Sequence, residues 1–227
     1  MKNIKYPKFS VILPVYYEDN LNHFKESIES IFKQDLQFDQ LIIVCDGPLK
    51  QNLDFFIENL NNNLSILIIR IKNNKGLANA LNTALLKCRN ELVFRMDADD
   101  ICVPNRFSLQ IEYILRNPEI DVLSGYVREF CEDGNQTKFI KEVPLEHYEI
   151  FNYAKLRNPV NHMAVLFKKS VVLRYGGYPN LRRSQDYALW TCLLKNGCKF
   201  SNLKRVLVDV RSGKSLYKRR NFYYFLQ

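Results

Sequence analysis

The segment Leu92-Val93-Phe94-Arg95-Met96-Asp97-Ala98-Asp99-Asp100 joins a short apolar run to three carboxylates within four residues. Carboxylates this close repel one another, so the group costs free energy unless a cation lies among them. We expect no basic side chain to neutralise it. Oxygen ligands at a strand end suit Mg²⁺ or Mn²⁺, which shares its other positions with water and phosphate. A solvated turn with a helix cap is the alternative.

Apolar runs alternate with helical periodicities around this segment. The predicted strands cover 9–15, 41–45, 65–71 and 92–96, and the predicted helices cover 21–34, 53–60 and 76–88. This alternation predicts an α/β fold, with a Rossmann-like, mostly parallel sheet covered by helices on both faces. Ligands bind such sheets beyond the carboxyl ends of the strands, where Glu18, Asp46 and Asp97–Asp100 all fall.

The composition of the 227 residues fits one α/β domain with a sizeable core. No apolar run approaches the ~20 residues of a membrane-spanning helix, and the N-terminus shows no signal-peptide pattern. Six cysteines are scattered without a Cys-x-x-Cys pair. Their spacing predicts buried free thiols in a reducing cytoplasm and gives no zinc-ligand pattern.

Basic residues are concentrated in the C-terminal part of the chain. Residues 151–227 hold 16 Lys and Arg against two acids, whereas residues 1–150 hold 17 Lys and Arg against 22 acids. A basic part suits an anionic membrane surface, a phosphorylated substrate or nucleic acid, and a solvated face of no specific use is the alternative. Residues 218–226 mix charge with aromatic rings, as interfacial membrane segments do.

Five motifs in one order resemble family 2 glycosyltransferases, which have the GT-A fold. They are Ser10–Glu18, Val44–Gly47, Asn74–Asn82, Met96–Asp100 and, on the acceptor side, Ser184–Trp190. The resemblance spans roughly residues 9–215. It implies a nucleotide-sugar-binding half over 1–110 and an acceptor-binding half over 111–227, within a single GT-A domain. Within the family, the chain resembles bacterial enzymes that assemble exopolysaccharide, capsule or lipopolysaccharide.

The resemblance implies a donor site for a nucleotide sugar, with UDP as the expected nucleotide. Glu18 would lie near ribose or base, and Asp46 would accept hydrogen bonds from the base; both could instead be turn acids. A glycine at a helix start permits close approach of backbone to the diphosphate. The other residues assigned to this site are Pro14, Val15, Tyr16, Asn74, Lys75 and Gly76, and Lys75 could equally be an exposed loop lysine.

Asp97 and Asp99, on either side of Ala98, match the family's Asp-x-Asp motif. Asp97 would contact ribose, and Asp99 would bind the Mn²⁺ or Mg²⁺ that bridges the diphosphate, with Asp97 as a second candidate ligand. Such an ion neutralises charge on the departing diphosphate. Asp100 is a third carboxylate, or a cap for the helix that Pro104 helps to start.

One departure from the family lies near Arg211. Many relatives carry a histidine there that completes the metal site, and this sequence has none after His162. Arg211, with Lys214, Lys218 and Arg219, could instead neutralise phosphate directly, because Arg and Lys bind phosphate well.

Asp186 matches the family's catalytic base, which takes the proton of the attacking hydroxyl. The alternative is a helix-start acid paired with Arg182 or Arg183. The family often has Glu before this Asp, where this chain has Gln185, but the base position is retained. His162 lies in a segment that often faces the acceptor, with a structural histidine as the alternative.

These observations predict an inverting, metal-assisted sugar transfer to a glycan or lipid-linked glycan acceptor in surface-polysaccharide biosynthesis. We expect a cytoplasmic enzyme, peripheral to the inner face of the cytoplasmic membrane, with no nucleic-acid partner. Two rival classes stay open. One is a non-catalytic or truncated nucleotide-binding remnant of such an enzyme. The other is a basic nucleic-acid-binding protein, although no recognition motif supports it.

Overall fold

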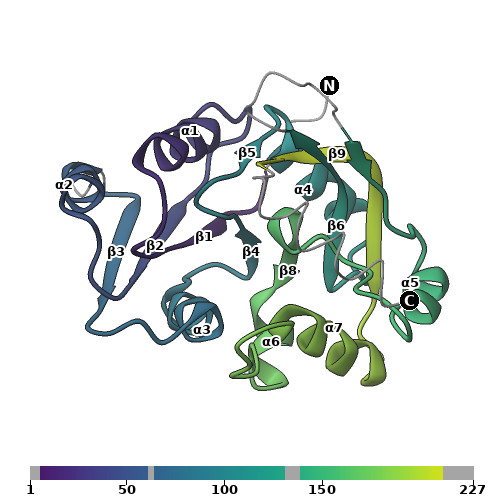
Figure 1. Cartoon of the computed structure of the whole chain (residues 1–227). Helices are drawn as coiled ribbons and strands as arrows, with labels where there is room; N and C mark the ends of the chain where they lie inside the picture. The colour runs from purple at the N-terminus through teal and green to yellow at the C-terminus, as the bar shows by residue number, and fades with distance from the viewer. Residues whose placement is uncertain (1–5, 61–63, 131–138, 212–227) are drawn as a thin grey trace.

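A twisted sheet with helices on both faces forms the molecule (Figure 1). The computed structural model describes residues 6–60, 64–130 and 139–211. The strands are β1 (Phe9–Val15), β2 (Gln40–Asp46), β3 (Ile66–Ile71), β4 (Leu92–Arg95), β5 (Ile101–Cys102), β6 (Val122–Phe130), β7 (Phe139–Lys141), β8 (Leu166–Lys168) and β9 (Phe200–Arg211). The helices are α1 (Leu21–Phe32), α2 (Gln51–Leu60), α3 (Leu77–Lys87), α4 (Arg106–Arg116), α5 (His147–Tyr153), α6 (Lys169–Arg174) and α7 (Gln185–Lys195), with a 3₁₀ turn η1 (His162–Ala164).

The strands and helices predicted for the first half are confirmed, each within two residues of its expected bounds. Strand β1 pairs in parallel with both β2 and β4, and β2 pairs in parallel with β3. The strand order therefore begins β3-β2-β1-β4, so the chain reverses direction across the sheet at β1. Loops that leave β1 and β4 diverge at this point, which opens a crevice at the carboxyl ends of the strands.

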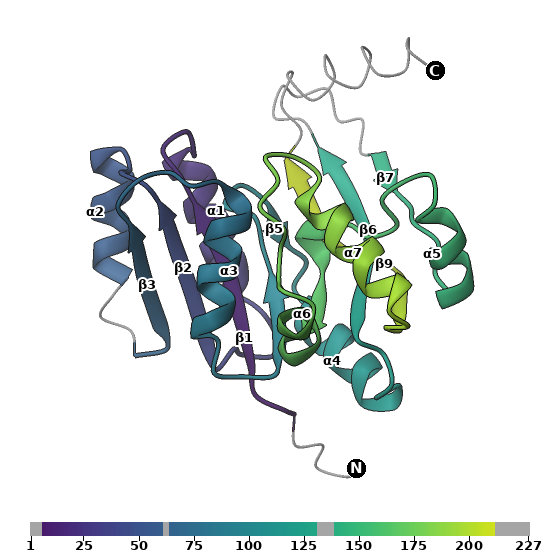
Figure 2. The same ribbon diagram turned by 90° about the horizontal axis from the view of Figure 1, so that it is seen from below.

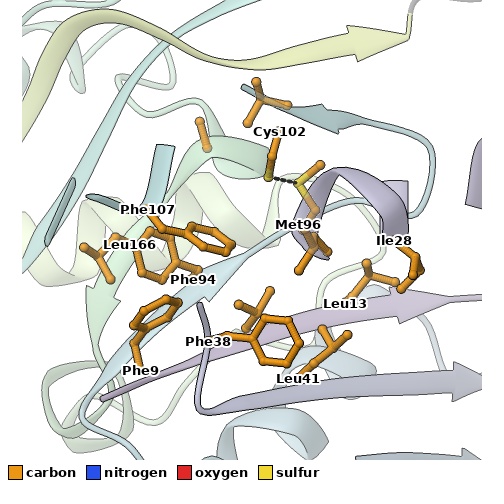
Figure 3. Packing of buried hydrophobic residues seen from close by; sticks show 14 of the residues in the cluster. Phe9, Leu13, Ile28, Phe38, Leu41, Phe94, Met96, Cys102, Phe107 and Leu166 are labelled. Atoms are coloured by element: carbon orange, nitrogen blue, oxygen red, sulfur yellow. Dashed lines mark hydrogen bonds between the residues drawn. The ribbon is translucent and has the colours of Figure 1, made fainter. Parts of the chain in front are cut away.

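Alternate side chains of β1 enter two separate cores. Phe9, Val11 and Leu13 pack with α1, α2 and α4 on one face, whereas Ile12 packs with α3, α6 and α7 on the other. This period of two is the consequence of strand geometry, and it explains why the parallel strands read as uninterrupted apolar runs. On the first face the rings of Phe9, Phe94 and Phe107 meet with centroids 4.6–5.2 Å apart (Figure 3).

The second half of the chain adds antiparallel strands to this parallel sheet. Strand β8 runs antiparallel to both β4 and β6, and β5 runs antiparallel to β9. The long strands β6 and β9 are parallel to each other. Because β8 pairs directly with β4, the second half of the chain lies beside the strand that leads into the Asp97–Asp100 loop. The complete sheet is therefore mixed, and its predicted, mostly parallel part is β3-β2-β1-β4.

No helix in the described part of the chain is long and apolar enough to cross a bilayer. The five described cysteines are free thiols, as predicted, and four of them are buried; Cys131 lies outside the described residues. Burial raises the pKa of Cys45 to about 11 and that of Cys88 to about 12, so neither forms a reactive thiolate near neutral pH.

Candidate functional site

A cavity of about 710 Å³ opens where β1, β2 and β4 end. Its lining consists of Pro14, Val15, Tyr16, Asp19, Asp46, Asn74, Gly76, Leu77, Ala80, Asp97, Ala98, Asp99, Arg182 and Arg183. Nine of the twelve donor-side residues singled out from the sequence meet in this one cavity. The other three, Glu18, Lys75 and Arg211, do not line it.

Asp46 holds the loop that leads into α3. Its two carboxylate oxygens accept the backbone N–H groups of Lys75 and Gly76, each at 2.8 Å, and its carbonyl accepts from the Asn74 side chain at 3.1 Å. Gly76 caps α3 with φ +87°, and Gly47 has φ +90°. A Cβ on Gly47 would lie 2.7 Å from the Asn74 nitrogen, so only glycine fits there. The contact of Asp46 with the base of a nucleotide stays a prediction.

Arg95 neutralises the first acid of the Asp-x-Asp motif. Its Nη1 donates to Asp97 Oδ2 at 2.6 Å, and its Nη2 donates to Asp97 Oδ1. The Arg95 side chain is only 2% exposed. The expectation that no base would neutralise the carboxylates is therefore wrong. Arg95 lies in the same segment, two residues before Asp97, but the sequence alone does not show that the two side chains turn toward each other.

Asp19 faces the cavity where the sequence pointed to Glu18. Asp19 Oδ2 accepts the backbone N–H of Tyr16 at 2.8 Å, and Tyr16 accepts the Asp19 N–H in return, which closes a turn after β1. Glu18 points outward and accepts a hydrogen bond from the Tyr16 hydroxyl at 3.3 Å. The available signal was an acid three residues after Tyr16, since Asp side chains that bond nearby backbone groups are common in turns.

The acids in the cavity create a negative potential that is only partly compensated. Burial, together with the charge of Asp97, raises the pKa of Asp99 above its usual value. Burial, with the charges of Asp99 and Asp97, raises the pKa of Asp19 to about 7. A divalent cation would relieve this repulsion, because it favours the ionised form of both acids.

The side chains at the cavity wall fit a metal ion that takes only some of its ligands from the protein. Among the described residues, no group of three or more His, Cys, Asp or Glu side chains is placed to hold a metal. Mg²⁺ is commonly bound by one or two carboxylates together with substrate phosphates and water. Asp99, at the cavity wall with a raised pKa, suits that arrangement. Both oxygens of Asp97 are already engaged by Arg95.

Asp100 and Arg211 help to hold the Asp97–Asp100 loop in place. Asp100 is buried and accepts the backbone N–H of Arg211 at 3.1 Å. It therefore does not cap α4, which begins at Arg106 after Asn105 and has no side-chain cap bond. The Arg211 side chain donates to the Asp99 carbonyl at 3.1 Å and pairs with Glu26 on α1. Lys214, Lys218 and Arg219 lie outside the described residues.

Asp186 stands in the first turn of α7 and is half-buried. Its Oδ2 accepts from the Asn158 side chain at 2.7 Å. The alternative pairing with Arg182 or Arg183 is not found within the described residues, where Asp186 has no salt bridge. Asp186 and Asp97 both act, after burial, to raise the pKa of Tyr178. Acids from the two halves of the chain therefore lie within electrostatic reach of one buried tyrosine.

His162 has a structural environment. It is 8% exposed, its Nε2 lies 3.0 Å from the Tyr178 hydroxyl, and its ring meets Trp190 edge-on. Burial, with the nearby charge of Arg95, holds the pKa of His162 well below its usual value. A neutral imidazole in a cluster of aromatic rings supports packing of the second half. This is the structural role that was the alternative to contact with the acceptor.

The sequence matches a known protein family. The family model described as Glycosyl transferase family 2 matches residues 10–174. The chain belongs to glycosyltransferase family 2. The family 2 chain is 39% identical over 214 residues to the UDP-Gal:alpha-D-GlcNAc-diphosphoundecaprenol beta-1,3-galactosyltransferase of Escherichia coli, covering 94% of this chain and 78% of that one. It is 34% identical over 219 residues to the amylovoran biosynthesis glycosyltransferase AmsE of Erwinia amylovora, covering 96% and 82%.

A solved structure shows the same fold. The mannosyltransferase from Pyrobaculum calidifontis, in complex with GDP-Man and Mn²⁺, matches this family 2 glycosyltransferase with a TM-score of 0.71 and 19% sequence identity. The match covers 96% of this chain but only 60% of that protein. At this identity the likeness establishes the GT-A fold alone.

Proposed function

We propose that this glycosyltransferase moves a sugar from a UDP-linked donor to a lipid-linked glycan in surface-polysaccharide biosynthesis, with inversion at the anomeric carbon. The convergence of four sequence motifs on one cavity carries the proposal. At about 710 Å³ the cavity lies within the usual range of small-molecule sites, roughly 300–1,000 Å³. The E. coli relative, named for a UDP-Gal donor and a diphosphoundecaprenol-linked acceptor, supports this choice of substrates.

The donor half, over residues 1–110, would bind the nucleotide at the carboxyl ends of β1, β2 and β4. Asp46 fixes the Asn74–Gly76 loop, and Gly76 lets the start of α3 approach a phosphate closely. Asp99 would hold Mn²⁺ or Mg²⁺. When bound, such an ion supplies Lewis-acid stabilisation of the departing diphosphate. Arg95 holds the Asp97 carboxylate in a fixed place.

The acceptor half, over residues 111–227, would supply the general base. Asp186 is the motif-matched acid on that side, and Asn158 fixes the orientation of its carboxylate through Oδ2. The other oxygen would take the proton of the acceptor hydroxyl as that hydroxyl attacks the anomeric carbon. A single displacement with one base needs no covalent intermediate, so the anomeric configuration inverts.

We further propose contact with the inner face of the cytoplasmic membrane, where a lipid-linked acceptor would lie. Tyr148, Phe151 and Leu156, in and after α5, are exposed, at 77%, 40% and 85%. Lys155 lies over the Phe151 ring at 5.3 Å, and Arg157, two residues further along the chain, is exposed. Aromatic rings mixed with basic groups suit an anionic membrane surface. Helix α5 lies on the outer flank, far from α1–α3 (Figure 2).

A thermal-shift screen of nucleotide sugars, with and without Mn²⁺, tests the donor. A ligand at 100 times its Kd adds about 2.7 kcal/mol to the free energy of unfolding, so a true donor should stand out. Asp99→Asn should lose the Mn²⁺-dependent part, whereas Glu119→Gln, at an exposed acid outside the cavity, should keep it. Failure of every nucleotide sugar to stabilise the protein would reject the proposal. Binding without transfer or donor hydrolysis would instead favour the non-catalytic remnant.

A further inference from the structure

The cavity lining is rich in acids, although a nucleotide sugar carries a negatively charged diphosphate. Asp19, Asp46, Asp97 and Asp99 all line it. Arg95 compensates Asp97 from below the surface, and backbone N–H groups hold Asp46. The two basic residues in the lining are Arg182 and Arg183. Both come from the second half of the chain, just before α7.

The segment that carries these arginines, residues 179–184, is anchored at both ends. Before it, Asn82 on α3 accepts the backbone N–H of Tyr178 and donates to its carbonyl, each at 2.8 Å. A Cβ on Gly177 would lie 2.5 Å from the Asn82 Oδ1 atom, so this anchor also needs glycine. After it, α7 begins, and α7 packs in the second core. The segment is therefore held across the cavity between α3 and α7.

Ser184, at the end of the segment, has φ +57°. Within the described residues it is the one non-glycine residue in the left-handed region. Such a conformation costs free energy in a serine, and it persists where the surrounding structure requires it. Here it turns the chain from the arginine segment into α7, two residues before Asp186.

Arg182 and Arg183 are exposed, and neither forms an ion pair with a described residue. Both line the acid-rich cavity. The planar guanidinium fork matches two phosphate oxygens at once, and arginine is favoured for phosphate recognition for this reason. Their position is thus suited to an anion that enters the cavity.

We propose that residues 179–184 form a diphosphate clasp, in which Arg182 and Arg183 bind the diphosphate of a substrate in the cavity. This inference rests on the proposed function. The diphosphate could belong to the nucleotide donor or to a lipid-linked acceptor, and the chemistry of the clasp is the same for both.

Calorimetry with uridine, UMP, UDP and inorganic pyrophosphate tests the clasp. The variant is Arg182→Gln/Arg183→Gln, and the control is Arg174→Gln, at an exposed arginine outside the cavity. We expect at least a 10-fold loss of UDP and pyrophosphate affinity in the double variant, a smaller loss for UMP and none for uridine. Equal losses for uridine and UDP would show a merely structural role and overturn the clasp. A thermal melt of each variant confirms that it is folded.

Further measurements distinguish a donor diphosphate from an acceptor diphosphate. They also separate failure of the clasp from failure of the proposed function. If UDP affinity is unchanged but KM rises for a lipid-diphosphate acceptor and not for a phosphate-free glycan, the clasp serves the acceptor. If neither changes, the clasp is wrong. If the wild type binds pyrophosphate through the arginines but no nucleotide, the clasp stands and the proposed function fails. If the wild type binds neither UDP nor pyrophosphate, both fail.

Discussion

The Arg95–Asp97 pair gives a prediction about stability that the structure makes quantitative. The two side chains share one bidentate bridge, but their burial differs: Arg95 is 2% exposed and Asp97 is 29% exposed. Removing the carboxylate by Asp97→Asn leaves a guanidinium that water cannot reach and whose Nε already has no hydrogen-bond partner. Removing the guanidinium by Arg95→Gln leaves a carboxylate that water can partly hydrate. The first change should therefore cost more.

Breaking a buried ion pair by removing one partner costs about 3–5 kcal/mol, so Asp97→Asn should lose that much. For a chain of this size the loss corresponds to a fall in Tm of roughly 6–20 °C. Arg95→Gln should lose about 1–3 kcal/mol, because its orphaned partner stays partly hydrated. The double variant should be more stable than the two single losses predict, since no charge is then left alone.

Urea unfolding of the wild type, the two single variants and the double variant measures these losses of stability as a double-mutant cycle. The comparison requires that the four m-values be equal. Glu29→Gln is the matched control, because its pair with Lys33 is exposed on both sides and should contribute no more than about 0.5 kcal/mol. An Asp97→Asn protein within 1 kcal/mol of wild type would refute the reasoning. So would additive losses in the cycle, since they would show that the two charges do not depend on each other.

Three other predictions concern catalysis, pH and the membrane. Asp186→Asn should keep UDP affinity but lower the transfer rate by about 10²–10⁴-fold, and NMR of the wild-type product should show the inverted anomer. Because the folded-state pKa of Asp19 is about 7 and its unfolded pKa about 3.9, ionisation of Asp19 destabilises the fold as pH rises between those values. Asp19→Asn should then gain urea stability over wild type at pH 8 and not at pH 4. Tyr148→Ser/Leu156→Ser should reduce flotation with anionic liposomes, whereas Phe55→Ser, at an exposed ring on α2 at the other end of the molecule (Figure 2), should not.

The parallel half of the fold could be predicted from the sequence because its signals are local. Strands buried on both faces read as continuous apolar runs, and β1 shows this along its whole length. The motifs after β1, β2 and β4 follow from the same physics, since parallel strands carry their carboxyl ends to one edge. The antiparallel pairing of β8 with β4 has no such signal. It joins residues more than 70 positions apart through strands of three and four residues.

The side-chain partners inside the site were harder to predict than its position. Sequence reasoning chose Glu18 over Asp19, because only the turn geometry shows which of two adjacent acids turns inward. It missed Arg95 as the partner of Asp97, since the bridge depends on how the chain bends after β4. The sequence suggests Arg182 and Arg183 only as partners of Asp186, whereas the structure places both in the cavity lining.

The distribution of charge along the chain has a consequence for the site. Residues 1–150 carry an excess of acids, and their Asp19, Asp46 and Asp99 line the cavity; residues 151–227 carry an excess of bases, and the cavity's two arginines come from them. A diphosphate bound by the arginines, with a cation held at Asp99, would attract groups from both of these parts of the chain. Asp186 follows the arginines by only a few residues on a helix packed in the second core. An anion bound by the arginines would therefore contact the same stretch of chain that positions Asp186. Donor binding and base placement would then depend on each other through residues 179–186.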